Sequence, residues 1–114
     1  MHSGEFVDSL GLHIGNTIAD VGTGVGHLLP YIRGTIFAVD INPEFLDKVR
    51  ERIAVQGWRN VHPVLGTERA PKLPAKRLDG AIVLDTYHHL NHPEATMQGL
   101  RRAVKSDGRL FVID

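Results

Sequence analysis

The sequence predicts a doubly wound α/β domain, in which helices cover both faces of a parallel sheet. Short apolar segments with polar ends alternate along the chain with segments of helical periodicity. The apolar segments are nearly continuous, as strands buried on both faces are. A glycine-rich turn, VGTGVGH, directly follows the first of them. Because crossovers between parallel strands are right-handed, these elements favour a sheet with a ligand site at the carboxyl ends of its strands.

Length and composition predict one globular domain over residues 1–114. The chain is 42% hydrophobic and 23% charged, which is too apolar for a disordered segment and too short for two domains. Thirteen basic and thirteen acidic residues balance, so we expect neither a nucleic-acid partner nor a membrane partner. The absence of cysteine excludes disulfides and thiol catalysis. With no membrane-length apolar run and no signal-like start, the expected location is cytoplasmic.

The first half of the chain predicts a strand, a short helix and a second strand. The strands are Thr17–Val21 and Thr35–Asp40, each of which ends in a polar or glycine-rich turn. Between them, Gly24–Ile32 has room for only a short helix, and Pro30 removes one of its hydrogen bonds.

The longest predicted helix spans residues 42–57. Asn42 can cap its start, Pro43 suits the first turn, and Gly57 occupies the position where a C-terminal glycine is typical. Apolar residues recur at helical spacing and are expected to lie on the sheet, while polar residues take the other face. The apolar set is Phe45, Leu46, Val49 and Ile53, and the polar set is Glu44, Lys48, Glu51 and Arg52.

The second half of the chain predicts three strands and one more helix. Val61–Leu65 contains Pro63 and is therefore expected at a sheet edge, where a missing hydrogen-bond donor is tolerated. The other elements are a strand at Leu78–Leu84, a helix at Pro93–Val104 with Met97, Leu100 and Val104 inward, a turn at Asp107-Gly108, and a last strand at Arg109–Ile113.

The glycine-rich turn and the end of the second strand together predict a site for an adenosine-like ligand. Glycines let the backbone approach a ligand closely, and a helix start offers free N–H groups to an anion. Asp40, 18 residues beyond Gly22, is placed to accept hydrogen bonds from ribose hydroxyls. His27 stands where a dinucleotide fingerprint has Gly or Ala, which disfavours an NAD-dependent oxidoreductase. Taken singly, Asp40 could instead cap the following helix and Asp20 could accept N–H groups within the turn.

Four motifs occur in a fixed order along the chain. They are Asp20-x-Gly22-x-Gly24-x-Gly26, then Val39-Asp40, then Gly66 after the third strand, then DTYHHL at residues 85–90. This pattern resembles the class I S-adenosylmethionine (SAM) dependent methyltransferases, and the region DTYHHLNHPEATMQGLRRAVKSDGRLFVID is similar to their small-molecule branch. The resemblance covers residues 10–114 and implies a Rossmann-like methyltransferase fold with strand order 3-2-1-4-5.

The resemblance also implies a set of cofactor-binding residues. Asp20 would face the methionine amino group through water, and Asp40 would bind the ribose hydroxyls. Ile41 would pack on the adenine face, Glu68 would approach the adenine amino group, and Asp85 would border the methyl group and the acceptor pocket. The remaining members are Gly22, Thr23, Gly24 and Gly26, whose backbone would pass close to the cofactor, and Thr67, the neighbour of Glu68.

The chemistry implied by the resemblance is methyl transfer to a small molecule, which needs no nucleophilic residue because the donor is already activated. Alignment of donor and acceptor and exclusion of water are the main requirements. For a hydroxyl acceptor, His88 or His89 is the candidate base, although both could equally cap or pack the start of the last helix. We expect no metal site, because Pro93 starts that helix after the histidines and separates them from helical ligand spacing.

The predicted sheet ends at its fifth strand and lacks the antiparallel hairpin that the family places beside it. The segment 110–113 should therefore show an open apolar edge, and we expect either a homo-oligomer formed through it or marginal stability. A SAM-binding or S-adenosylhomocysteine (SAH) binding module, or a vestigial fragment with little turnover, is the alternative to an active enzyme.

Overall fold

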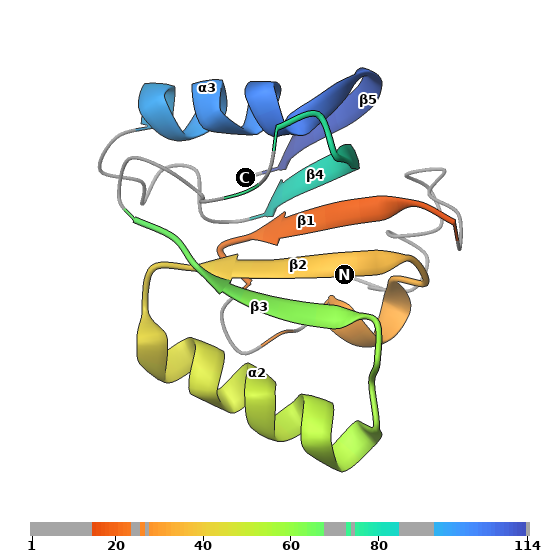
Figure 1. Cartoon of the computed structure of the whole chain (residues 1–114). Helices are drawn as coiled ribbons and strands as arrows, with labels where there is room; N and C mark the ends of the chain where they lie inside the picture. The colour runs from red at the N-terminus through yellow and green to blue at the C-terminus, as the bar shows by residue number, and fades with distance from the viewer. Residues whose placement is uncertain are drawn as a thin grey trace.

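A computed structural model describes residues 15–23, 26, 28–67, 73, 75–84 and 93–113. Five strands in this part of the chain form one sheet, in which every pairing is parallel and the order is β3-β2-β1-β4-β5 (Figure 1). Both the predicted topology and the edge position of the proline-containing strand are confirmed. The strands are β1 (Thr17–Val21), β2 (Thr35–Asp40), β3 (Val61–Leu65), β4 (Leu78–Leu84) and β5 (Val104–Ile113).

Helices lie on opposite faces of the sheet, as a doubly wound fold requires. Helix α2 (Pro43–Gln56) packs against β2 and β3, and α3 (Pro93–Ala103) packs against β5 (Figure 1). Alternate residues of β1 enter different cores: Ile18 packs with Val49 of α2, whereas Ala19 belongs to the core that contains Leu100 of α3. Both cores are apolar and shielded from solvent, since Ile18, Ala19 and Leu100 are fully buried.

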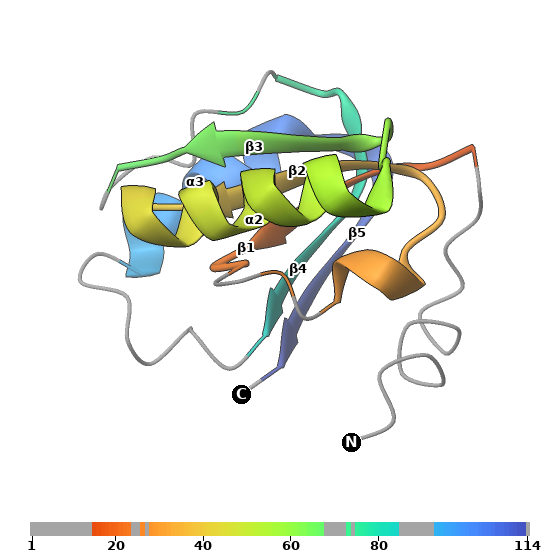
Figure 2. The ribbon, with the colours of Figure 1, turned by 90° about the horizontal axis from the view of Figure 1, so that it is seen from below.

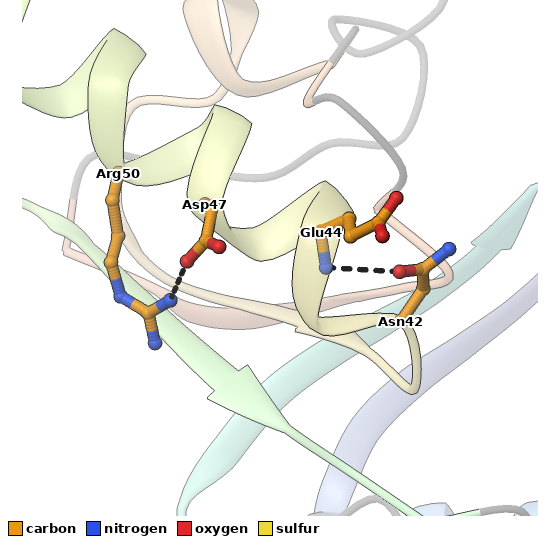
Figure 3. A network of polar contacts seen from close by, with 4 residues as sticks. All are labelled: Asn42, Glu44, Asp47 and Arg50. Carbon is orange, nitrogen blue, oxygen red and sulfur yellow. Dashed lines mark hydrogen bonds and ion pairs between the residues drawn. The ribbon is translucent and has the colours of Figure 1, made fainter.

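The local signals at the ends of α2 are confirmed. The Asn42 side chain accepts a hydrogen bond from the Glu44 N–H at 2.9 Å (Figure 3), and Gly57 ends the helix in the left-handed conformation at φ 69°. Leu46 and Val49 are buried as expected, but Phe45 is 41% exposed. The expectation that Phe45 faces the sheet is wrong, because the buried face of α2 is centred on Leu46 and Val49 and Phe45 lies at its margin.

The short helix predicted at Gly24–Ile32 is described only as a 3₁₀ helix, η1, at Leu29–Tyr31. Pro30 lies in its first turn, where its missing N–H is tolerated. Figure 2 shows η1 and α2 on the same side of the sheet. Leu29 is buried there in the same core as Val49.

The last strand begins earlier than the sequence predicts. Strand β5 follows α3 without a turn, and Val104 pairs with Leu78 while Arg109 pairs with Gly80. Between these two pairs β5 has four residues, 105–108, where β4 has only Asp79, so the expected Asp107-Gly108 turn is part of a bulge inside the strand. Met97, Leu100 and Val104 are buried as predicted, although Val104 belongs to the strand rather than to the helix.

A carboxylate joins three strands at the amino end of the sheet. Asp79 accepts a hydrogen bond from the Thr17 N–H at 2.7 Å and forms an ion pair with the Lys105 ammonium at 3.0 Å. Both hydrogen bonds lower the pKa of the Asp79 carboxyl, and the one from Thr17 has the larger effect. These contacts fix β1 and the bulge of β5 to β4 at the end opposite to the carboxyl ends of the strands.

Among the described residues, no helix combines the length and the apolar character that a membrane crossing needs.

Candidate functional site

The candidate site lies where β1 and β2 end. The arrowheads of β1, β2, β3 and β4 point to the same side in Figure 1, so the carboxyl ends of the strands share one edge of the sheet. Asp20 and Asp40 stand at the ends of the neighbouring strands β1 and β2. Their charges interact, since the negative charge of Asp40 contributes to raising the pKa of Asp20. The structure therefore brings together the two carboxylates that the sequence singled out.

Asp20 is a buried carboxylate. Only 3% of the surface of Asp20 is exposed, and Asp20 Oδ2 accepts a hydrogen bond from the Thr23 hydroxyl at 3.0 Å. Burial raises the pKa of Asp20 from 3.8 to about 6; the Thr23 hydrogen bond opposes this change and the charge of Asp40 adds to it. A buried carboxylate at a strand end with a raised pKa is typical of a functional site, because a cationic ligand can offset the cost of its charge.

The start of the glycine-rich turn is fixed by the neighbouring strand. The N–H groups of Gly22 and Thr23 both donate to the Val39 carbonyl, at 2.8 and 3.0 Å. Gly22 has φ 74°, which glycine adopts without strain. The expectation of free N–H groups at a helix start is therefore wrong for these two residues, because their donors are already bound and η1 is a single short turn. Thr23 contributes instead by supporting Asp20 with its hydroxyl.

Gly26 closes the turn with φ 88°, and its N–H donates to the Thr23 carbonyl at 2.9 Å. A guanidinium from α2 binds the same residue: Arg52 Nη1 donates to the Gly26 carbonyl at 2.6 Å. The sequence pattern placed Arg52 on the polar face of its helix and gave no indication of this contact. The sequence feature that comes closest to indicating it is Trp58, just beyond the helix. The centroid of its ring lies 5.3 Å from the guanidinium carbon of Arg52.

The end of β2 carries the second carboxylate and an exposed apolar side chain. Asp40 Oδ1 accepts a hydrogen bond from the Asn42 N–H at 3.0 Å, but the residue that caps α2 is Asn42 and not Asp40. A carboxylate has about four acceptor positions, so this contact is compatible with ligand binding. Ile41, the next residue, is 53% exposed. Thr67 is also exposed and follows Gly66, whose N–H donates to the Asp40 carbonyl at 3.0 Å.

The remaining candidates lie outside the described residues. They are Gly24, Glu68, Asp85, His88 and His89.

The fold and the site together define a class of protein. A parallel sheet of order 3-2-1-4-5 with acidic residues at the ends of β1 and β2 is a Rossmann-like domain of the class I SAM-dependent methyltransferase type. The family described as "Methyltransferase domain" matches residues 19–112, and the chain belongs to this family. SAM is the cofactor of this class of domain.

Known relatives share this fold over a longer chain. The uncharacterized methyltransferase YcgJ of Bacillus subtilis is 26% identical in an alignment of 101 positions that covers 85% of this chain and 40% of the relative. The ubiquinone/menaquinone biosynthesis C-methyltransferase UbiE of Cupriavidus necator is 26% identical in an alignment of 110 positions that covers 91% of this chain and 45% of the relative. The crystal structure of a SAM-dependent methyltransferase from Aquifex aeolicus superposes with a TM-score of 0.86 at 29% identity, covering 91% of this chain and 58% of that one. The chain thus spans less than half the length of these two curated relatives.

Proposed function

We propose that this chain binds SAM at the carboxyl ends of β1 and β2 and transfers its methyl group to a small-molecule acceptor. The observation that carries this proposal is the buried carboxylate of Asp20 beside the carboxylate of Asp40. A ligand with an ammonium group and two adjacent hydroxyls suits such a pair, since one carboxylate gains a counter-charge and the other gains donors.

In this proposal each part of SAM has residues of its own at this edge of the sheet. Asp20, supported by Thr23, would hold the methionine ammonium, and this interaction would offset the burial that raises the pKa of Asp20. Asp40 would accept hydrogen bonds from the ribose hydroxyls. The exposed side chain of Ile41 would cover one face of the adenine, and this contact would remove apolar surface from water. The backbone turn at Gly22, Thr23, Gly24 and Gly26 would enclose the methionine part, and Thr67 and Glu68 would flank the adenine edge.

The bound cofactor supplies a methyl group on a sulfonium, whose bond to sulfur breaks as the bond to the acceptor forms and whose electron pair stays on sulfur. The chain then has to hold that methyl group in line with the acceptor and keep water away. Asp85 would border the acceptor pocket, and His88 or His89 would take the proton of a hydroxyl acceptor. Methyl transfer then depends on where the methyl group and the acceptor are held. Because the turn after β1 would enclose the methionine part of the cofactor, the conformation of that turn is the first requirement.

Two observations support a small molecule as the acceptor. UbiE carries the name of a C-methyltransferase of ubiquinone and menaquinone biosynthesis, and it aligns with this chain over 110 residues. Equal numbers of acidic and basic residues give the chain no net charge to attract nucleic acid.

Transfer from labelled SAM to a fractionated cell extract tests the acceptor class. We expect label in the small-molecule fraction, none in the protein and nucleic-acid fractions, and a loss of labelling in an Asp40→Ala control. Label in a macromolecular fraction would contradict the small-molecule proposal. SAH binding without transfer to any fraction would favour the binding module over the enzyme.

We also propose that the chain self-associates through β5, with a second copy of β5 as the partner. In the described part of the chain β5 pairs with β4 alone, and Val112 is 41% exposed on this outer strand. A sheet edge with unpaired backbone groups and apolar side chains readily adds another strand. We expect light scattering at tens of micromolar to report a dimer or larger species, and a Val112→Lys variant to be a monomer. A monomeric parent chain would overturn this proposal.

A further inference from the structure

Arg52 connects helix α2 to the turn that follows β1. Its Nη1 donates to the Gly26 carbonyl at 2.6 Å, across 26 positions of the sequence. A short hydrogen bond from a guanidinium to a carbonyl is charge-assisted and stronger than a bond between neutral groups. The Gly26 carbonyl also accepts the Leu29 N–H at 3.3 Å, so it is the point where the turn, η1 and α2 meet.

The guanidinium is held in place from its other side. The Trp58 ring centroid lies 5.3 Å from the Arg52 guanidinium carbon, in the range of a cation–π contact. Trp58 is itself fixed, because its backbone N–H donates to the Ile53 carbonyl at 3.2 Å and its side chain packs against the core beneath α2. Arg52 is half-buried, and its guanidinium has a partner on the turn and a partner on the ring of Trp58.

The contact at Gly26 continues to the buried carboxylate of the site. Gly26 N–H donates to the Thr23 carbonyl at 2.9 Å, and the Thr23 hydroxyl donates to Asp20 Oδ2 at 3.0 Å. Gly26 also has φ 88°, a conformation from which a glycine escapes easily when nothing holds it. A fixed Gly26 carbonyl therefore holds the end of the turn, while the Val39 carbonyl holds its start at Gly22 and Thr23.

We propose that Arg52 is a positioning residue for cofactor binding, which holds the glycine-rich turn in its binding-competent conformation through the Gly26 carbonyl. This inference rests on the proposed role of that turn in holding SAM. Without Arg52 the turn samples other conformations, and the apparent affinity for the cofactor falls by the fraction of time spent in them. The step of methyl transfer, which takes place after the cofactor is bound, changes much less.

The test compares three variants on one helix. Arg52→Met keeps the apolar stem over Trp58 and removes the donor, whereas Arg52→Lys keeps a charged donor. Arg50→Met is the matched control, because Arg50 is an exposed arginine of the same helix that pairs with Asp47 at 3.1 Å (Figure 3). The readouts are SAH affinity by calorimetry and hydrogen exchange of the Gly26 amide without ligand.

Arg52→Met is expected to weaken SAH binding about tenfold and to speed exchange of the Gly26 amide. We expect Arg52→Lys to recover about half of the lost binding free energy and Arg50→Met to bind SAH within twofold of the parent chain. If the activity is measured, KM for SAM rises about tenfold in Arg52→Met while kcat stays within about twofold.

Parent-like SAH affinity in Arg52→Met overturns the inference, even if the variant melts at a lower temperature, because Arg52 would then serve stability alone. If Arg52→Met does not fold, faster exchange of the Gly26 amide in Arg52→Lys without any loss of SAH affinity has the same meaning, because the turn would then be loosened with no effect on binding. Failure of the parent chain to bind SAH is a different result, because it removes the proposed function, while the exchange measurement still reports whether Arg52 holds the turn.

Discussion

Asp20→Asn is expected to make the free protein more stable at pH 7 and to weaken its binding of SAH. The pKa of the buried Asp20 carboxyl is raised from 3.8 to about 6, which corresponds to about 3 kcal/mol of destabilisation once the group is ionised. An asparagine carries no charge to bury and still accepts the Thr23 hydroxyl. Allowing for its two amide donors, we expect a net gain of about 2 kcal/mol, or roughly 8 °C in Tm.

The pH dependence of this gain follows from the direction of the pKa change. Between about pH 4 and pH 6 the carboxyl of the unfolded chain has ionised while that of the folded chain keeps its proton. The folded parent chain binds more protons in this window, so its stability falls as pH rises. The stability difference between Asp20→Asn and the parent should therefore be small below pH 4 and full above about pH 6, as measured by thermal melts across this range.

Binding should change in the opposite direction to stability. A carboxylate paired with an ammonium contributes about 2 kcal/mol more than a neutral amide, so the SAH affinity of Asp20→Asn should fall about thirtyfold. In the parent chain at pH 6, binding should release about half a proton, detectable as a buffer-dependent heat of titration. A variant that is less stable than the parent at pH 7, or one that binds SAH equally well, would contradict this role for Asp20.

The second large effect is expected at the bulge of β5, where Gly108→Ala should destabilise the fold by about 3 kcal/mol. A Cβ at Gly108 would stand 2.9 Å from the Asp79 carbonyl oxygen and 3.1 Å from that of Lys105, and it would collide with the Val104 side chain. Two of these three neighbours are backbone atoms, which cannot rotate away. The substituted chain must therefore open the bulge or shift β5 along β4.

Thermal melts measure this effect, and Gly15→Ala is the control. Nothing lies within 4 Å of a Cβ at Gly15, so that variant should melt within about 2 °C of the parent chain. Gly108→Ala should melt more than 10 °C lower, yet bind SAH normally well below its Tm, because the bulge lies beside the amino end of β4. A Gly108→Ala variant as stable as Gly15→Ala would show that the bulge has more room than its geometry indicates.

Much of the sheet was predictable because its strands are short apolar segments bounded by turn residues. Thr17–Val21 and Thr35–Asp40 agree with the structure, and the signals at Asn42 and Gly57 mark the ends of α2 correctly. The bulge of β5 was not predictable, since Asp107-Gly108 carries the local signal of a turn. The need for glycine there comes from the Asp79 carbonyl of the neighbouring strand and from Val104 and Lys105, which the bulge brings close to it.

The candidate site shows the same division between local and long-range information. Asp40 was identified from the sequence because it ends a strand, and Asp20 because the motif at residues 20–26 resembles that of the methyltransferases. The parallel sheet places both at one edge. The hydrogen bonds from Gly22 and Thr23 to the Val39 carbonyl depend on the pairing of β1 with β2. Arg52 was assigned to the polar face of its helix because helical periodicity describes a single helix and contains no information about the loop packed beside it.

Calorimetric titration of the parent chain and of Asp40→Ala with SAH tests the central claim, that a SAM site lies at the carboxyl ends of β1 and β2. We expect one binding site in the parent chain and an affinity at least tenfold lower in Asp40→Ala, about 1.4 kcal/mol, with both proteins shown to be folded. Equal affinities would place the ligand elsewhere on the molecule. No binding to the folded parent chain would mean that the methyltransferase fold is present here without its cofactor site.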